Sequence, residues 1–439
     1  MAKSIEQKYV KQKHIDHIKE LPDTYIGSVE ETIEERWVFD RSVNRMVKKN
    51  IKFIPGLYKI YDELLVNALD HYVRLNNAVD NGMLCDAVPV TIIRIDIDQE
   101  SGLTTIYNNG DGIDVAIHKT YNKWVPSLIF GDLLTSSNYD KNEKKITGGK
   151  NGYGAKLTNI FSKLFTIETV DNINNKKFIQ VFKNNMSHKG KPKITKNSSN
   201  PYTKISYIPD FERFNIQRYS DDMISIMEKR AYDCAAWTNN KVSVYLNGKK
   251  ITTNTFEKYI NLYVGTKKEH PRAYEKYNDR WEIAATINPY HSFENISFVN
   301  GINTTRGGKH VTNILNQITR KIIAYIKKKK KITVKSNCIK DNIMLFVKSI
   351  IENPSFDSQT KETLTTAANK FGSKCVISDS FIETLAKSGV MEKAIALNAF
   401  KESHDFKKTD GVKRNRLRGI PKLEDANWAG GKKSEACCL

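Results

Sequence analysis

This chain has few cysteines, few acidic residues relative to basic ones and no long apolar run. Each of these shortages excludes certain kinds of protein. Only 6 of its 439 residues are cysteines, at positions 85, 234, 338, 375, 437 and 438, and no two form a Cys-x-x-Cys pair. This spacing excludes a disulfide framework and a zinc site, and it favours a reduced setting: the nucleus, the cytoplasm or the virion of a large DNA virus. The chain also lacks an apolar run of about eighteen residues and a signal-peptide core, so we expect a soluble protein without membrane contact.

The shortage of acidic residues leaves the chain strongly basic. It carries 49 acidic residues against 70 lysines and arginines, a formal net charge of +21. Such a balance indicates a polyanionic partner, nucleic acid first, although the Asn/Lys-rich usage of an AT-rich genome produces a basic balance as well. A chain of 439 residues exceeds what one core usually serves, so we expect two or three domains.

Glycines are concentrated in residues 146–157, which contain four of them at positions 148, 149, 152 and 154. Glycines let backbone N–H groups approach an oxyanion closely, and the helical pattern that follows predicts further unpaired N–H groups. Lys150 and Lys156 supply mobile positive charge beside them. A glycine-rich loop that binds nothing is equally compatible with this segment by itself.

A polar stripe lies on a predicted helix over residues 55–75, whose apolar residues recur at helical spacing after Pro55. Glu63, Asn67, Asp70 and Arg74 share this stripe. One interpretation is a solvated face with an ion pair between Asp70 and Arg74. The other is a carboxylate that orients water, one turn from an amide oxygen that coordinates a hard cation.

A predicted strand over residues 90–97 is followed by a second strand that runs into Asn108, Gly110 and Gly112. Because Asn-Gly and Asp-Gly are strong turn dipeptides, the simplest reading of this end is a hairpin.

These three segments together resemble the successive motifs of the GHKL ATPases: Glu63 and Asn67, then Asn108 to Gly112, then Gly149 to Gly154. Within that superfamily the chain is similar to eukaryotic-type DNA topoisomerase II, from about residue 15 to its last residue. The resemblance rests on sequence motifs that occur in the same order as in the family, at residues 21–30, 136–139, 147–156, 297–310 and 352–362.

The resemblance implies ATP and Mg²⁺ as cofactors. Glu63 matches the general base that activates water, Asn67 matches the Mg²⁺ ligand, and Lys361 matches a residue that reaches the γ-phosphate from a second domain. Nucleotide contacts are implied for a larger set: Asn67, Asn108, Ser136, Ser137, Asn138, Gly149, Asn151, Gly152, Tyr153, Gly154, Ala155, Lys156, Thr203, Gln359 and Lys361. Asp111 departs from the family pattern, where lysine is common, and we assign it no nucleotide contact.

The domain organisation expected from pattern and resemblance has four parts. Residues 1–50 form an N-terminal arm, residues 51–262 a GHKL ATP-binding α/β sandwich, and residues 263–410 a transducer domain whose small sheet contains a βαβ unit. Residues 411–439 form a linker and resemble the start of a truncated Toprim domain. In the family the arm reaches into the partner subunit, which makes Tyr25 a candidate for closing the neighbour's nucleotide site; a strap packed on its own subunit is equally compatible.

Five lysines, Lys327 to Lys331, end a predicted helix over residues 311–326. A helix C-terminus favours cations, but five in a row exceed that need. The family places a DNA-facing loop here, so we predict contact with double-stranded DNA.

The predicted function is an ATP-operated dimerisation gate of a type II DNA topoisomerase, which captures a duplex for passage through a double-strand break made by a C-terminal part that this sequence lacks. The protein would be a homodimer closed by ATP. The alternative within the superfamily is a clamp ATPase of the mismatch-repair or chaperone type. A histidine kinase and a purely DNA-binding structural protein are less compatible, because the former needs a separate phospho-accepting helix and the latter leaves the Glu63/Asn67 pairing without a purpose.

Overall fold

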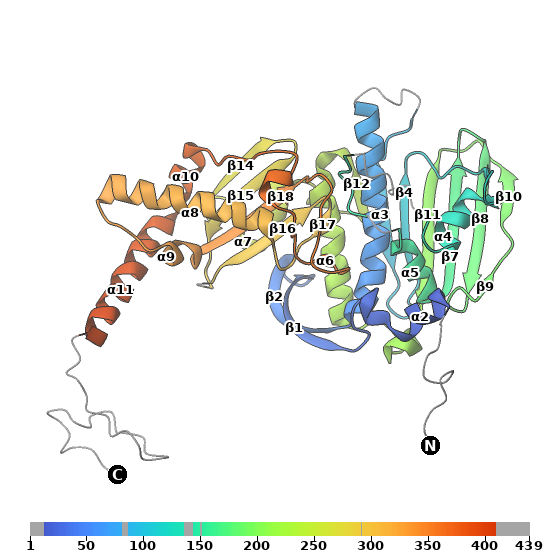
Figure 1. Cartoon of the computed structure of the whole chain (residues 1–439), viewed down its shortest axis with the longest axis horizontal. Helices are drawn as coiled ribbons and strands as arrows, with labels where there is room; N and C mark the ends of the chain where they lie inside the picture. Colours follow the sequence, from blue (N-terminus) through green and yellow to red (C-terminus); the bar gives the residue numbers. More distant parts are fainter. Residues whose placement is uncertain (1–12, 81–86, 136–143, 150–151, 291, 410–439) are drawn as a thin grey trace, which may run out of the picture.

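The computed structural model describes residues 13–80, 87–135, 144–149, 152–290 and 292–409. Two β-sheets organise these residues, and the long helices α3 (Pro55–Asp80) and α6 (Asp221–Thr238) stand between them (Figure 1). Among the described helices, none combines the length and apolar character that a membrane crossing requires.

The first sheet has nine strands and carries its helices on one face. Its path runs β10-β8-β7-β11-β4-β3-β12-β13, with β9 paired to β8, and only the β12–β3 pair is parallel. Its strands are β3 (Ile92–Ile97), β4 (Thr104–Asn109), β7 (Ser162–Asp171), β8 (Lys176–Lys183), β9 (His188–Lys189), β10 (Lys193–Lys196), β11 (Tyr202–Pro209), β12 (Ser243–Leu246) and β13 (Lys249–Lys250).

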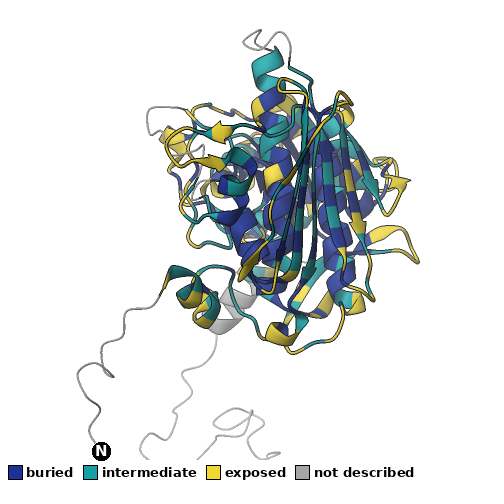
Figure 2. Ribbon diagram, turned by 90° about the vertical axis from the view of Figure 1, so that its right-hand side faces the viewer, coloured by how far each residue is buried: buried dark blue, intermediate teal, exposed yellow. Residues whose placement is uncertain are grey.

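The alternation of buried and less buried residues along these strands explains why helices pack on one face of the sheet. In β4 every second residue is buried, so one side of the strand packs on the helices and the other remains more accessible. Figure 2 shows the buried residues concentrated where the helices meet the sheet and the exposed ones in the surrounding loops and edges. The shorter helices of this layer are α4 (Val125–Gly131), α5 (Gly154–Ile160) and α7 (Phe256–Val264), with the short strands β5 (Ile117–His118) and β6 (Lys123–Trp124) before α4.

The second sheet has five strands in the order β14-β15-β18-β16-β17. Strands β16 and β18 are parallel and are joined through helix α8, which is the predicted βαβ unit. The elements of this part are β14 (Arg272–Asn278), β15 (Trp281–Ile287), β16 (Glu294–Val299), β17 (Ile302–Asn303), α8 (Lys309–Lys330), α9 (Ser336–Lys340), β18 (Ile343–Ser349), α10 (Asp379–Leu385) and α11 (Met391–Thr409).

Both faces of the second sheet are covered, which is why β15 and β18 read as nearly continuous apolar runs. Ile283 and Leu345 belong to the core shared with α8, whereas Ala284 and Phe346 belong to the core shared with the first sheet's helices. Neighbouring residues along one strand therefore serve two different cores. This packing attaches the second sheet to the ATPase-like part of the chain through apolar contacts.

The N-terminal segment packs on its own chain. Helix α2 (His14–Glu20) leads to the antiparallel hairpin β1 (Thr32–Asp40) and β2 (Arg45–Phe53), which contacts α6. The single-turn helices are η1 (Pro22–Thr24), η2 (Phe211–Phe214), η3 (Asn239–Lys241) and η4 (Ala368–Lys370), and the π-helical turn η5 (Ala386–Val390) joins α10 to α11. The predicted boundaries at residues 50, 262 and 410 stay predictions.

Candidate nucleotide-binding and catalytic site

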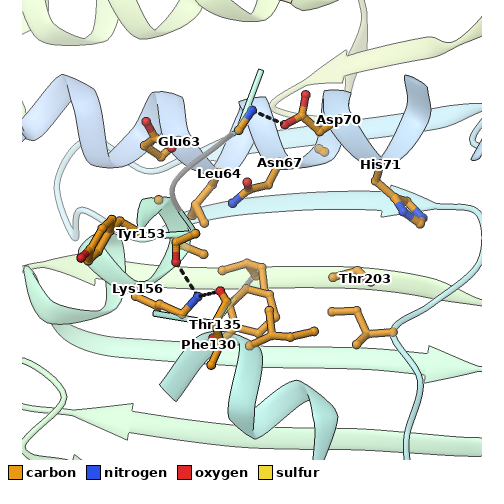
Figure 3. A pocket seen from close by; sticks show the side chains of 18 of the residues that line it. Glu63, Leu64, Asn67, Asp70, His71, Phe130, Thr135, Tyr153, Lys156 and Thr203 are labelled. Carbon is orange, nitrogen blue, oxygen red and sulfur yellow. Dashed lines mark hydrogen bonds between the residues drawn. The ribbon is translucent and has the colours of Figure 1, made fainter. Parts of the chain in front are cut away.

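A cavity of about 810 Å³ lies between helix α3, the end of the first sheet and the glycine-rich loop. Its lining includes every described residue, except Tyr25, that the resemblance implies for catalysis or nucleotide contact, and Figure 3 labels several of them. These are Glu63, Asn67, Asn108, Gly149, Gly152, Tyr153, Gly154, Ala155, Lys156, Thr203, Gln359 and Lys361. Ser136, Ser137, Asn138 and Asn151 are outside the described residues, as is the Toprim-like segment 411–439.

Glu63 lies in the wall of this cavity and is only 3% exposed. Its Oε1 is 2.7 Å from Lys59 Nζ, one turn earlier on α3, and 3.2 Å from Lys361 Nζ, which belongs to a loop after the second sheet. Burial favours the neutral acid, but the charges of Lys361 and Lys59 outweigh it and hold the pKa of Glu63 below its usual value. The carboxylate is therefore ionised at neutral pH and can accept a proton.

Asn67 presents its side chain to the cavity one turn beyond Glu63 (Figure 3). Asp70 follows, but it does not form the ion pair with Arg74 that one interpretation of the stripe predicts. The Asp70 carboxylate accepts hydrogen bonds from Gly148 N at 2.6 Å and Gly149 N at 2.7 Å, while Arg74 Nη2 lies 3.1 Å from His71 Nδ1. Burial raises the pKa of Asp70 to about 6 although both N–H groups oppose that shift.

The end of strand β4 forms the floor of the cavity with β11. Asn108 and Thr203 are register partners on these strands, so their positions in the sheet are coupled by the ladder. Asn108 is buried, and its Nδ2 donates to Asn109 O at 2.9 Å. Thr203 Oγ1 is 3.2 Å from Thr169 Oγ1 on β7. Together these residues place amide and hydroxyl groups on the floor of the cavity.

The hairpin that Asn-Gly and Asp-Gly predict after β4 does not form. The turn from β3 to β4 lies at residues 98–103 instead, and the chain beyond Asn109 continues into the loop toward β5. Gly112 is required there because a Cβ would overlap Val170 O. The Asp111 carboxylate accepts from Val88 N at 2.9 Å and does not line the cavity, a structural role for the position that departs from the family pattern.

Gly154 is where the glycine-rich loop meets helix α3. It begins the seven-residue helix α5, and a Cβ at this position would overlap Glu63 Oε2. Only a glycine permits this approach of the loop backbone to the carboxylate with both in place.

Lys156 differs from the prediction of a mobile positive charge. It is 4% exposed, and its Nζ donates to Thr135 O at 2.7 Å and to Gly152 O at 2.6 Å (Figure 3). Burial lowers its pKa to about 8. Lys156 therefore acts as a brace between the glycine-rich loop and the segment after α4, because a buried ammonium stays where its hydrogen-bond partners are.

Three buried charged residues that sequence reasoning did not select support the site. Lys59 pairs with Glu63, and its i,i+4 spacing on a predicted helix could have revealed it. Asp62 pairs with Arg230 on α6 at 2.6 Å, and Arg230 Nη2 also donates to Gly301 O beside the second sheet at 2.8 Å. The Asp62–Arg230 pair joins residues 168 apart, so no local sequence signal identifies it.

Tyr25 of the N-terminal segment packs near the site in the same chain. Its hydroxyl lies 3.0 Å from His17 Nδ1, and its ring centroid is 6.1 Å from that of Tyr153 in the glycine-rich loop. Whether the arm exchanges between subunits stays a prediction. The lysine run, Lys327 to Lys331, lies far along the chain on the exposed last turn of α8, where Lys331 adopts a left-handed backbone at φ 60°.

The fold and the site together define a class: a GHKL-type ATPase fold joined to a second α/β part whose Lys361 reaches the cavity. Residues 244–414 match the family model of DNA gyrase B. The chain is 42% identical to the crystallised ATPase region of Saccharomyces cerevisiae topoisomerase II, with a TM-score of 0.82 over 90% of this chain and 99% of that one. It is also 42% identical to the ATPase and transducer domains of Balamuthia mandrillaris DNA topoisomerase II, with a TM-score of 0.84 over 91% and 100% of the two chains.

Full-length relatives agree with the solved structures. DNA topoisomerase 2 of Drosophila melanogaster is 45% identical over 100% of this chain and 30% of its own length. The enzyme of Acanthamoeba polyphaga mimivirus is 46% identical over 100% of this chain and 34% of its own length. The chain belongs to the DNA topoisomerase II family and corresponds to its ATPase and transducer region, about a third of the length of these relatives.

Proposed function

We propose that this chain binds and hydrolyses ATP as the nucleotide-operated gate of a type II DNA topoisomerase. The observation that carries the proposal is the meeting of three elements at one carboxylate. Glu63 of α3 is approached by Gly154 of the glycine-rich loop and by Lys361 from beyond the second sheet. A site built this way can respond to a bound nucleotide and report it to a second domain.

The residues of the cavity fit a magnesium nucleotide. The volume suits a ligand of this size. Asn67 offers an amide oxygen, a suitable ligand for Mg²⁺, and Gly152, Gly154 and Lys361 offer backbone and ammonium donors for phosphate oxygens. Asn108 and Thr203 would contact the adenine base on the floor of the cavity. Tyr25 of the N-terminal arm would help to close the nucleotide site. When bound, Mg²⁺ would neutralise phosphate charge and polarise the bond to be cleaved.

Glu63 would act as the general base. Its ionised carboxylate can take a proton from water as the oxygen attacks phosphorus, which requires a proton acceptor within hydrogen-bond reach. Lys361 Nζ donates a hydrogen bond to this carboxylate at 3.2 Å. Once Lys361 transfers to phosphate, Glu63 loses one of its two cations, so its pKa rises and it becomes a stronger base.

In the whole protein, closure of two such chains would capture duplex DNA for passage through a transient break made elsewhere in the enzyme. We place DNA along the exposed Lys327–Lys331 run and a homodimer contact at the N-terminal arm. Such an enzyme would act in the nucleus, cytoplasm or virion, wherever its DNA is. We do not retain the mismatch-repair or chaperone alternative, because the similarity to topoisomerase II extends through both sheets.

Replacement of Glu63 with Gln tests the catalytic assignment. The amide keeps the size and most hydrogen bonding but cannot accept the proton, so ATP turnover should fall on the order of 10²- to 10⁴-fold. Binding of a non-hydrolysable ATP analogue, measured by calorimetry, should survive. Glu168→Gln is a matched control on the first sheet, outside the cavity lining, and should stay within a few-fold of wild type. Near-normal turnover in Glu63→Gln would remove Glu63 from this role.

A further inference from the structure

The first residues of the glycine-rich loop, 145–149, are held by two different parts of the fold. On one side, Asp70 of α3 accepts hydrogen bonds from Gly148 N and Gly149 N. On the other side, the contacts come from the second sheet and the segment that follows it. We call residues 145–149 the loop stem.

Asn353 forms a reciprocal pair with the loop stem. Its N–H donates to Lys145 O at 2.8 Å, and its side-chain Oδ1 accepts from Lys145 N at 3.2 Å. The two residues are 208 positions apart, so this is a tertiary contact between the ATP-binding part and the chain after β18. Asn353 itself is exposed and adopts a left-handed backbone at φ 45°.

Asn300 makes a second, buried contact with the same stem. It follows β16, is 1% exposed, and its Nδ2 donates to Thr147 O at 3.3 Å and to Ile351 O at 2.8 Å. Its Oδ1 accepts from Ile351 N at 2.8 Å. Because Ile351 follows β18, one side chain joins the loop stem to the two parallel strands β16 and β18.

Steric contact reinforces these hydrogen bonds. A Cβ on Gly148 would lie 2.9 Å from Ile302 Cδ1 of β17 and 3.2 Å from Asn300 O. The backbone of the loop stem is therefore in close contact with the turn between β16 and β17. A rotation of the second sheet would have to move the stem or break these contacts, because packed contacts of this kind do not deform continuously.

We propose that Asn300 and Asn353 are positioning residues through which the second sheet holds the glycine-rich loop, by a linkage separate from Lys361. This inference rests on the proposed nucleotide-binding function of the loop. Lys361 joins the second domain to Glu63, whereas the stem linkage joins it to the glycine-rich loop that lines the cavity. The second domain therefore contacts the site both at Lys361 and at the loop stem, and each of these contacts can transmit nucleotide state without the other.

Variants of Asn353 test the linkage because this residue is exposed and lies outside the cavity lining. Asn353→Gly keeps the left-handed backbone and the N–H but removes the acceptor for Lys145 N. Asn353→Asp keeps an acceptor and tolerates the same backbone, so it should rescue. Asn175→Gly is the matched control, an exposed asparagine at φ 49° in the turn between β7 and β8.

The first measurement is hydrogen exchange in the ligand-free protein. Asn353→Gly should speed exchange at Lys145, Gly148 and Gly149 by about threefold to tenfold, the expected effect of losing one hydrogen bond. Asn353→Asp and Asn175→Gly should leave these amides unchanged. Wild-type exchange throughout the stem in Asn353→Gly would overturn the linkage without reference to any nucleotide.

The second measurement asks whether the linkage transmits nucleotide state. A non-hydrolysable ATP analogue should alter exchange in residues 294–303 and 343–353 of wild type and, less strongly, of Lys361→Ala. The double variant Lys361→Ala with Asn353→Gly should lose most of that residual response while still binding the analogue. Loss of the entire response in Lys361→Ala alone would overturn the proposal. If wild type binds no analogue, the proposed function fails, and the ligand-free exchange still decides whether the stem is held.

Discussion

At the residue scale, the site depends on the close approach of the Gly154 backbone to the side chain of Glu63. Its backbone lies so near Glu63 Oε2 that a single methyl group would overlap the carboxylate. Glu63 is in turn held between Lys59 and Lys361. A displacement on the order of 1 Å at such a group is expected to cost about 10²-fold in rate.

Gly154→Ala should therefore lower ATP turnover on the order of 10²-fold and stability by about 1–3 kcal/mol, the usual cost of overpacking. Turnover assays and urea unfolding would measure the two effects separately. Gly248→Ala is the control: it has no neighbour within 4 Å but a left-handed φ of +75°, so it should cost about 1–2 kcal/mol without loss of turnover. Equal turnover in Gly154→Ala and wild type would show that Glu63 need not sit where the structure has it.

The helical stripe on α3 illustrates what residue-level reasoning could and could not decide. Its apolar spacing predicted the helix, which the structure has as Pro55–Asp80. It left open whether Asp70 pairs with Arg74, and the structure directs Asp70 to Gly148 and Gly149 instead. Gly148 lies 78 positions and Gly149 lies 79 positions after Asp70 in the chain. No local spacing in the sequence predicts contacts between residues so far apart.

At the element scale, helix α8 both builds the second core and presents the lysine run. Its buried face includes Ile314, Ile318 and Ile322, which pack under the second sheet. Past Ile326 the helix continues as an exposed basic end. The apolar face explains the helix, but nothing in the core requires five exposed lysines.

Changing Lys328, Lys329 and Lys330 to Ala should weaken duplex binding to the same extent for all sequences, because phosphate contacts carry no base information. The log–log dependence of affinity on salt should lose about two to three units of slope if all three contact phosphate. DNA-stimulated ATP turnover should fall while basal turnover is retained.

The matched control removes three exposed lysines elsewhere, Lys191, Lys193 and Lys196 at the edge of the first sheet. It has the same change in net charge. An equal drop in slope for both triple variants would mean that general charge, and not the α8 end, determines DNA binding.

At the scale of the whole molecule, the two sheets share apolar packing and also a charged connection at the cavity. Lys361 is 6% exposed and adopts a left-handed backbone at φ 63°, and its ammonium lies beside Glu63. This contact joins the second domain to α3. A nucleotide that attracts Lys361 would shift the balance between domain arrangements by its differential affinity for them.

Lys361→Ala should lower ATP turnover. It should also reduce the decrease in radius of gyration that small-angle scattering detects when a non-hydrolysable ATP analogue is added. A residual change is expected from the stem linkage through Asn353. Lys370→Ala, an exposed lysine of η4, is the control and should behave as wild type. Wild-type scattering and turnover in Lys361→Ala would make Gln359 and Lys361 part of an ordinary surface loop.

The sequence by itself determined the elements and the candidate chemistry, because helical and strand periodicity and glycine clustering are local properties. It predicted α3 and the βαβ unit around α8. Through the resemblance to a family it also named residues that line the cavity, among them Glu63, Asn67 and Lys361, but not the apolar part of that lining. Tertiary structure alone decided which groups meet: Asp70 with the loop stem, Lys156 with Thr135, and Asn353 with Lys145. These contacts join segments far apart in the chain, where burial and the need to satisfy polar groups choose the partners.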